Sequence, residues 1–333
     1  MSRLKPGRRN LITDVDGIRV GNAEDRTAWS GTTVVVPDER AVAAAEVRGG
    51  APGTRDIQAL DPSCRIDAID AVVLSGGSMF GIDAAAGVTN VLAAAGRGYR
   101  ISTAVVPIVP AAILFDLVNG GDKSWGEDPP YRRLGAQAAR QLTQDFPLGN
   151  VGAGLGAKAG SLKGGLGSAS LVSDDGIQVG ALVAVNSWGQ VVMPGSRHFW
   201  AWPFEQDREF GGLGAPALSR PLELEMPTPP APPQLAANTT IAIVATNVAL
   251  DKGAARRMAL MADDGLARSI RPVHTPYDGD TVFAISTGRK PSGDLATLTL
   301  VGHMAADCLA RAVARAVYHA ETLGRFPGWK TLA

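Results

Sequence analysis

The chain has 333 residues and no net charge, with 32 basic and 32 acidic side chains. This balance gives no sign of a nucleic-acid partner, and no polybasic run indicates a membrane surface. Hydrophobic residues make up 45% of the chain but are dispersed, and no apolar stretch of about 18 residues predicts a transmembrane helix. We expect a cytoplasmic protein, because the N-terminus lacks the apolar segment of a signal peptide and Cys64 and Cys308 are isolated.

Predicted strands and helices alternate along the chain. Runs of β-branched and apolar residues predict strands at 11–13, 18–20, 32–36, 41–47, 71–74, 103–106, 180–186, 241–248 and 281–285. Helical periodicity predicts helices over about 82–95, 134–142, 251–269 and 292–323. Strands interleaved with long apolar helices indicate a layered α/β or α+β domain in which helices cover sheets.

Two segments have compositions that oppose regular elements. Residues 149–167 are dense in glycine, which resists helix formation and suits close backbone approach. Prolines crowd residues 216–233, and the stretch 216–237 is expected to be an extended, mobile linker. The strands after this linker are too few to stand alone, so we expect residues 1–333 to form one domain whose two parts share sheets.

The linker ends at Asn238-Thr239-Thr240, where a hydroxyl residue enters a buried strand. If the bond between Asn238 and Thr239 breaks, Thr239 carries a nucleophilic hydroxyl and a free α-amine that can act as its base. The reference pKa of such an amine, about 7.7–8.0, leaves part of it unprotonated at neutral pH. The alternative is that Thr239 only begins a strand, since threonine favours strands.

Further side chains are candidates for the same chemistry. Asp278 and Asp280 flank a glycine before a strand, where they can orient a nucleophile or simply form an Asp-Gly turn. Lys163, or its neighbour Lys158, lies among glycines and is either a solvated loop lysine or a buried amine that stabilises an oxyanion or lowers the pKa of a nearby amine. Asn186 ends its strand and can donate to an oxyanion or cap the strand.

Motifs for cofactors and metals are incomplete. Residues 152–157 match a dinucleotide-binding loop only loosely, because no clear strand precedes them and no helical pattern follows. The histidines are scattered, at positions 198, 274, 303 and 319, and show no metal-ligand spacing. We therefore expect neither a metal nor a cofactor.

Several segments, in family order along most of the chain, match one known family. They are residues 48–55, 75–81, 149–154, 163–167, 238–240 and 274–281. In these segments the chain resembles the L-aminopeptidase/D-esterase (DmpA-like) family of self-cleaving N-terminal-nucleophile hydrolases, which also contains the nylon-oligomer endohydrolases. Asn238-Thr239-Thr240 and the Asp278-Gly279-Asp280 turn look closer to the nylon-oligomer branch than to the serine-nucleophile aminopeptidases.

The resemblance implies a four-layer αββα fold and self-cleavage into residues 1–238 and 239–333. It implies that Thr239 is the nucleophile and that Asp278 and Asp280 orient it. Asn186 would serve the oxyanion or the substrate, and Lys163 would assist the amine or the cleavage, with Lys158 in reserve. Phe115 stands where some members have a tyrosine that can contact the substrate, so this chain lacks that hydroxyl. Family members also assemble from several cleaved units, which implies a homo-oligomer.

The sequence thus predicts a self-processing amide hydrolase that acts through an acyl-enzyme on 6-aminohexanoate oligomers, short peptides or amino-acid amides. Alternatives are an aminopeptidase or D-amino-acid esterase of the same family and an acyltransferase of related fold. A non-catalytic module that binds a ligand with its glycine-rich loops is a third. Substrate length, stereochemistry, and endo versus exo attack stay open.

Overall fold

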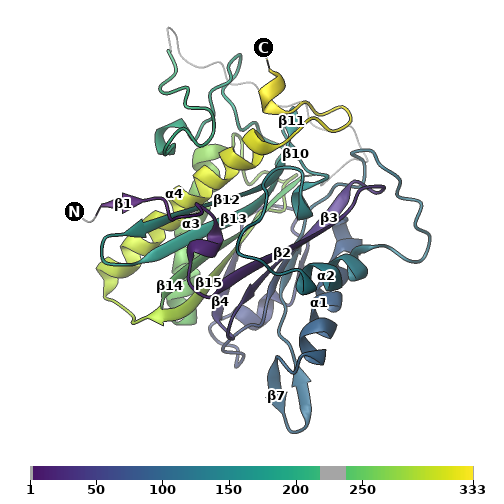
Figure 1. Cartoon of the computed structure of the whole chain (residues 1–333), viewed down its shortest axis with the longest axis vertical. Helices are drawn as coiled ribbons and strands as arrows, with labels where there is room; N and C mark the ends of the chain where they lie inside the picture. The colour runs from purple at the N-terminus through teal and green to yellow at the C-terminus, as the bar shows by residue number, and fades with distance from the viewer. Residues whose placement is uncertain (1–2, 218–237, 333) are drawn as a thin grey trace.

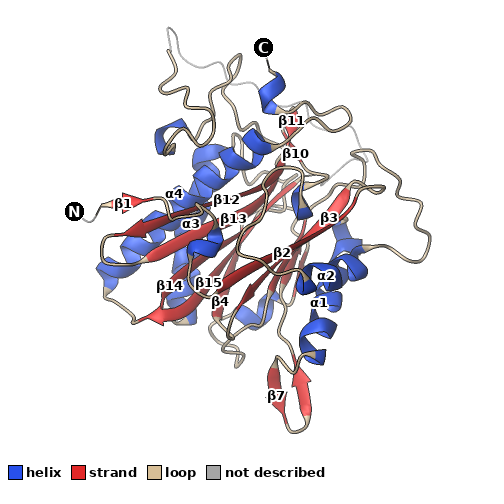
Figure 2. Cartoon of the chain, in the orientation of Figure 1, coloured by secondary structure: helices blue, strands red, loops and turns tan. Residues whose placement is uncertain are grey.

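Two β-sheets lie face to face, and a pair of helices covers the outer side of each (Figure 1 and Figure 2). The computed structural model describes residues 3–217 and 238–332, so most of the proline-rich segment 216–237 lies outside the described residues. The larger sheet is covered by α3 (Lys252–Ser269) and α4 (Leu295–His319), and the smaller by α1 (Asp83–Ala94) and α2 (Tyr131–Arg140). This order of layers confirms the expected αββα fold.

The larger sheet has six strands, and β14, which begins at the candidate nucleophile, is one of its central strands. In the order β1-β12-β13-β14-β15-β4, the strands span Leu4–Lys5, Gly165–Ser173, Gln178–Asn186, Thr239–Val248, Thr281–Lys290 and Val42–Val47. β14 pairs antiparallel with β13 and parallel with β15. Segments from both sides of residue 238 therefore share one sheet.

The smaller sheet has five strands. In the order β2-β3-β6-β9-β5, they span Ile18–Asp25, Ser30–Pro37, Val72–Ser75, Ala111–Ile113 and Thr54–Arg55. Two short hairpins lie outside both sheets: β7 (Tyr99–Ile101) with β8 (Ala104–Val106), at the bottom of Figure 1, and β10 (Lys158–Ala159) with β11 (Leu162–Lys163).

Alternating side chains of β14 fill the spaces on both of its faces. Ile241 and Ile243 pack between the two sheets, whereas Ala242 and Val244 pack toward α3 and α4. All four side chains are completely buried. A strand covered on both faces needs apolar residues at successive positions, which explains the continuous apolar run in its sequence.

One expectation from the sequence is corrected by the structure. The strand expected at 11–13 is instead a 3-10 helix at Ile12–Asp14, because Ile12 N donates to Ser168 Oγ and the Asp14 carboxylate accepts from Leu11 N, so side chains replace a strand partner. The strand expected at 103–106 is confirmed as β8, an arm of the β7–β8 hairpin outside the main sheets. The other expected strands and the four helices are confirmed with shifted ends.

Phe283 offers a test of the layer between the sheets, where its side chain is fully buried. Phe283→Ala should lower the free energy of unfolding by about 3 to 5 kcal/mol, because burial is lost and a cavity remains. The control is Leu295→Ala, at a side chain that is 82% exposed, which should change stability by less than about 0.5 kcal/mol. Denaturant unfolding followed by circular dichroism measures both, and equal losses would contradict the placement of β15.

Candidate active site

The candidate site lies at the start of β14, opposite the end of β13. Thr239 is only 4% exposed, and its hydroxyl donates to the carbonyl oxygen of the preceding residue, Asn238. Asn186 is the residue paired with Thr239 across the two strands. The hydroxyl of Thr239 is therefore held against the peptide bond that self-cleavage would break.

The turn Asp278-Gly279-Asp280, just before β15, packs directly on this hydroxyl. A methyl group at Gly279 would lie 2.8 Å from Thr239 Oγ1 and 2.5 Å from the carbonyl oxygen of Ala51, so the close approach requires glycine. Thr239 and the turn meet because β14 and β15 are parallel neighbours that begin at the same end of the sheet.

Both carboxylates of the turn are buried and bind backbone around the candidate nucleophile. Asp280 Oδ1 accepts from Thr240 N at 2.8 Å, and Asp278 Oδ1 accepts from Trp188 N at 3.1 Å. Burial raises the pKa of Asp278, and the neighbouring charge of Asp280 raises it further. Within residues 3–217 and 238–332, the hydrogen bonds of these two carboxylates go to groups other than the Thr239 hydroxyl.

Residues 48–51, which follow β4, support the same turn from outside. Arg48 N and Gly49 N donate to the carbonyl oxygen of Asp280 at 3.0 and 3.3 Å, and Ala51 N donates to that of Asp278 at 2.8 Å. A methyl group at Gly49 would lie 2.2 Å from Asp280 N. This contact gives a physical reason for the two glycines of the Arg-Gly-Gly-Ala sequence, which bring two backbones together.

The two candidate lysines are partners in the β10–β11 hairpin but face different acids. Lys163 Nζ donates to the carbonyl oxygens of Gly154 and Gly164 at 3.0 and 2.7 Å, and burial lowers its pKa to about 7 against the opposing charge of Asp116. Burial lowers the pKa of Lys158 to about 8, and the charge that opposes this shift is that of Asp278. Lys158 is thus the lysine whose acidic neighbour belongs to the Thr239 turn.

Asn186 connects the β10–β11 hairpin to Phe115, which follows strand β9 of the smaller sheet. Its Oδ1 accepts from Lys158 N at 3.0 Å, and its Nδ2 donates to the carbonyl oxygen of Phe115 at 3.0 Å. Phe115 is partly buried and makes this contact through its backbone, so the contact does not depend on a tyrosine hydroxyl. The bond to Phe115 uses one of the two N–H donors of the Asn186 amide.

His274 and Asp263 were assigned no role from the sequence, and the structure brings both to the turn. His274 Nδ1 lies 2.9 Å from Asp280 Oδ2, and its Nε2 lies 3.0 Å from Asp263 Oδ2. Burial by itself lowers the pKa of His274, but Asp263 and Asp280 outweigh it and raise the pKa to about 9. The sequence contained one indication that Asp263 has a special role. It is an acidic residue on the apolar face of a helix, between Ala262 and Leu266, which are buried in α3.

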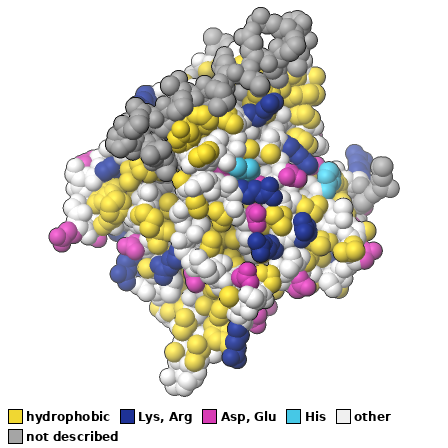
Figure 3. Space-filling model, turned by 180° about the vertical axis from the view of Figure 1, so that it is seen from behind, with side chains coloured by type: hydrophobic (Ala, Val, Ile, Leu, Met, Phe, Trp, Pro, Cys, Tyr) yellow, Lys and Arg dark blue, Asp and Glu magenta, His cyan; other side chains and the backbone are white. Residues whose placement is uncertain are grey.

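No group of histidine, cysteine and acidic side chains that could hold a metal ion occurs among the described residues. Both cysteines are free, with Cys64 exposed and Cys308 buried. In the same part of the chain, no helix is long and apolar enough to cross a membrane. On the face shown in Figure 3, acidic and basic side chains are interspersed.

Comparison with known proteins identifies the family. Residues 10–330 match the model of peptidase family S58. The chain belongs to this family. An uncharacterized aminopeptidase of Mycobacterium bovis is 41% identical over 97% of this chain and 98% of its own. A 6-aminohexanoate-oligomer endohydrolase of a Kocuria species is 30% identical over 84% of this chain and 76% of its own.

The fold of this peptidase also matches solved structures. The L-aminopeptidase D-Ala-esterase/amidase of Ochrobactrum anthropi superposes with a TM-score of 0.69 at 21% identity, covering 96% of this chain and 89% of that one. That structure is described as a variant of the N-terminal-nucleophile hydrolase fold. Family membership makes the chain a hydrolase of peptide bonds.

In this peptidase, the contact between Gly279 and Thr239 can be tested with one methyl group. Gly279→Ala should reduce the hydrolysis rate by about 10²-fold, the cost of displacing a reacting group by about 1 Å. The matched control is Gly253→Ala, where a methyl group meets only Asp251 Oδ1 at 3.4 Å. Initial rates on an amino-acid amide, measured on folded samples, compare the two; a normal rate for Gly279→Ala would show that the contact between the turn and the Thr239 hydroxyl does not matter for hydrolysis.

Proposed function

We propose that the chain is a self-processing threonine aminopeptidase, which cuts its own bond between Asn238 and Thr239 and then uses Thr239 to hydrolyse short peptides and amino-acid amides. The observation that carries this proposal is the hydrogen bond from the buried Thr239 hydroxyl to the Asn238 carbonyl. The packing of Gly279 on that hydroxyl supports it, because the group is fixed at the bond it would attack.

In the self-cleavage step, Thr239 Oγ1 attacks the carbonyl carbon of Asn238. The C–N bond breaks as the Thr239 nitrogen gains the hydroxyl proton, which leaves an ester between Asn238 and the Thr239 side chain. Water then opens the ester and gives a carboxylate on Asn238, and a free hydroxyl and α-amine on Thr239. The bond from Thr240 N to Asp280 holds the backbone in place throughout.

In the mature enzyme, the neutral α-amine takes the proton of the Thr239 hydroxyl as it attacks the substrate carbonyl. The leaving amine receives that proton, and water then hydrolyses the acyl-enzyme. Asn186 is proposed as a donor to the developing oxyanion. The charge of Lys158, beside Asp278, favours the neutral form of the amine by lowering its pKa.

The cleaved halves are proposed to remain one unit. β14, from the C-terminal half, pairs with β13 of the N-terminal half over eight residue positions, from Val179 opposite Thr246 to Asn186 opposite Thr239. The two halves also share the buried layer between the sheets. Separating them would expose that apolar layer to water, which is unfavourable. It would also leave a row of strand donors and acceptors unpaired.

Short peptides and amino-acid amides are the first substrates to try, because the Mycobacterium bovis relative named as an aminopeptidase aligns over nearly its whole length. Oligomers of 6-aminohexanoate are a second candidate, favoured by the likeness to the Kocuria endohydrolase. Each substrate should be assayed with and without an added acceptor amine. Release of free acid in both conditions supports a hydrolase, whereas product formed only with the acceptor would indicate an acyltransferase.

Intact-mass analysis under denaturing conditions tests self-cleavage. The wild-type protein should give pieces of residues 1–238 and 239–333, whereas Thr239→Ala should stay one inactive chain, because the hydroxyl that attacks Asn238 is gone. Thr240→Val is the matched control, since the adjacent threonine is equally buried but does not contact the Asn238 carbonyl. If Thr239→Ala splits at the same bond, the proposed mechanism is wrong.

The choice between the two lysines can be made with methionine, an unbranched side chain one atom shorter than lysine that removes the charge. Lys158→Met should lower kcat/KM by about 10²-fold, as expected for loss of a preorganised charge in a buried site. Lys163→Met should chiefly reduce stability, because it removes the buried hydrogen bonds from Lys163 Nζ to the Gly154 and Gly164 carbonyls. Steady-state kinetics and thermal melting of cleaved samples measure both effects, and the reverse pattern would assign the role to Lys163.

A further inference from the structure

Both oxygens of the Asp280 carboxylate accept hydrogen bonds, and His274 supplies two of its three donors among the described residues. Oδ1 accepts from Thr240 N at 2.8 Å, while Oδ2 accepts from both the backbone N and the ring Nδ1 of His274, at 3.1 and 2.9 Å. His274 therefore holds the carboxylate oxygen of Asp280 that does not bind β14. Asp280 in turn fixes the amide next to Thr239.

The second ring nitrogen of His274 is anchored to a different layer of the fold. Nε2 lies 3.0 Å from Asp263 Oδ2 on α3, and that carboxylate oxygen also lies 3.1 Å from Arg48 Nε. Asp263 is only 1% exposed. Arg48 is the residue before Gly49, which packs on Asp280, so the segment after β4 contacts both of the acidic residues that flank the imidazole.

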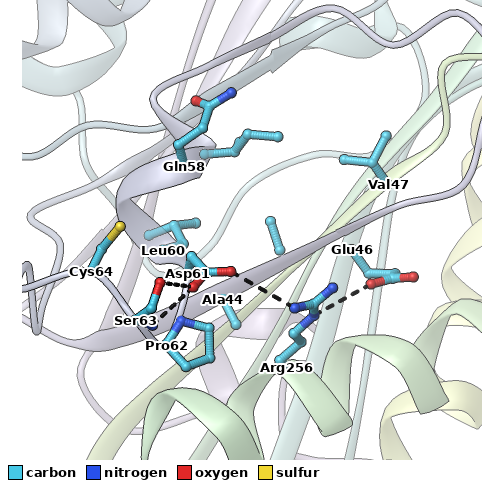
Figure 4. A pocket seen from close by; sticks show the side chains of 12 residues that line it. Ala44, Glu46, Val47, Gln58, Leu60, Asp61, Pro62, Ser63, Cys64 and Arg256 are labelled. Atoms are coloured by element: carbon cyan, nitrogen blue, oxygen red, sulfur yellow. Dashed lines mark hydrogen bonds and ion pairs between the residues drawn. The ribbon is translucent and has the colours of Figure 1, made fainter.

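The outer end of these contacts reaches solvent. Arg48 lies 3.6 Å from Glu46, and Glu46 lies 3.8 Å from Arg256. Figure 4 shows Glu46 and Arg256 at a cleft of about 490 Å³ beside β4. Alternating charges thus run from this cleft to β14, and only the inner members, Asp263 and Asp280, are deeply buried.

The backbone of His274 is held in an uncommon conformation. Its φ is +55°, in the left-handed region that residues other than glycine seldom adopt. This conformation allows the backbone N–H and the ring of one residue to reach the same carboxylate oxygen. Such strain persists where the surroundings determine the geometry closely, and it is concentrated at functional sites.

We propose that His274, clamped as an imidazolium between Asp263 and Asp280, is a positioning residue that locks Asp280 onto the Thr240 amide and so holds the Thr239 hydroxyl at the carbonyl it attacks. The inference rests on the proposed role of Thr239. Neither His274 nor Asp263 touches the reacting atoms. Their effect passes through Asp280 and the backbone of β14.

The charges around His274 set the pH range of this clamp. Asp263 faces it from α3, Asp280 and the nearby Asp278 lie on the turn, and Arg48 and Glu46 stand behind Asp263. Although burial opposes the charge, the two carboxylates raise the pKa of His274 from 6.5 to about 9. The clamp is therefore complete below the raised pKa and is lost as pH rises through about 9.

The test uses the cleaved enzyme with His274→Asn, Asp263→Asn and the double variant, assayed for kcat and KM on an amino-acid amide across pH 6 to 10.5. Asparagine suits position 274 because it tolerates positive φ. His303→Asn is the control. His303 lies 3.4 Å from Asp307 on the exposed side of α4, so this substitution also removes a histidine–aspartate pair, but one away from the site. Thermal melting of every variant checks that it is folded.

Each single variant should lower kcat by about 10- to 100-fold and leave KM within about threefold. The double variant should be no slower than the worse single one, because both changes break one clamp. Wild-type activity should fall as pH rises through about 9. His274→Asn should lose that decline, and Asp263→Asn should move it to lower pH, because removing an anion lowers the pKa of the imidazolium. His303→Asn should match wild type.

Wild-type kcat in both single variants, or losses that multiply in the double variant, would overturn the proposal. If His274→Asn does not fold, Asp263→Asn decides alone, since it keeps the imidazole: an unmoved decline near pH 9 refutes the clamp, and a decline at lower pH supports it. Failure of the proposed function is a separate result, because it would appear as activity in Thr239→Ala whatever the behaviour of His274.

Discussion

The hydrogen bond from Thr240 N to Asp280 connects the start of β14 to every element that supports it. On one side of this bond is a strand paired on both edges and buried on both faces. On the other is a turn held by residues 48–51 and by His274. Because a hydroxyl must be placed within fractions of an ångström to react, such a rigid link between strand and turn is what the proposed chemistry requires.

Burying three carboxylates near one hydroxyl is unfavourable unless each has partners. Asp280 has backbone donors and His274, and Asp263 has His274 and Arg48. Among the described residues, Asp278 accepts hydrogen bonds from the neutral donors of Trp188 and Thr275, and burial and the charge of Asp280 raise its pKa. Of the two carboxylates of the turn, Asp280 contacts the ring of His274, whereas Asp278 has a raised pKa.

The position of β14 within the sheet also bears on self-processing. The first residue of β14, a central strand, lies near the end of β13, the turn before β15 and the loop after β4. All of these lie where the strands begin or end, at one end of the sheet. Cutting the chain just before this strand removes no strand pairing, because residue 239 is where the strand begins. The fold can thus expose a new terminus at its site while the sheet stays intact.

The sequence by itself determined the elements with strong local patterns, since the period of apolar residues reports directly which faces are buried. It indicated β14, β15 and the four covering helices, and its motifs located Thr239, Asp278, Asp280 and Asn186 with their family. It misassigned residues 11–13, where hydrogen bonds to distant side chains replaced a strand partner. Only the tertiary structure decided which charged groups influence one another: the charge of Asp278 acts on Lys158 and that of Asp116 on Lys163, and Asp263 reaches His274 from another layer. These pairings join residues brought together by the packing of sheets and helices, and no local pattern encodes that packing.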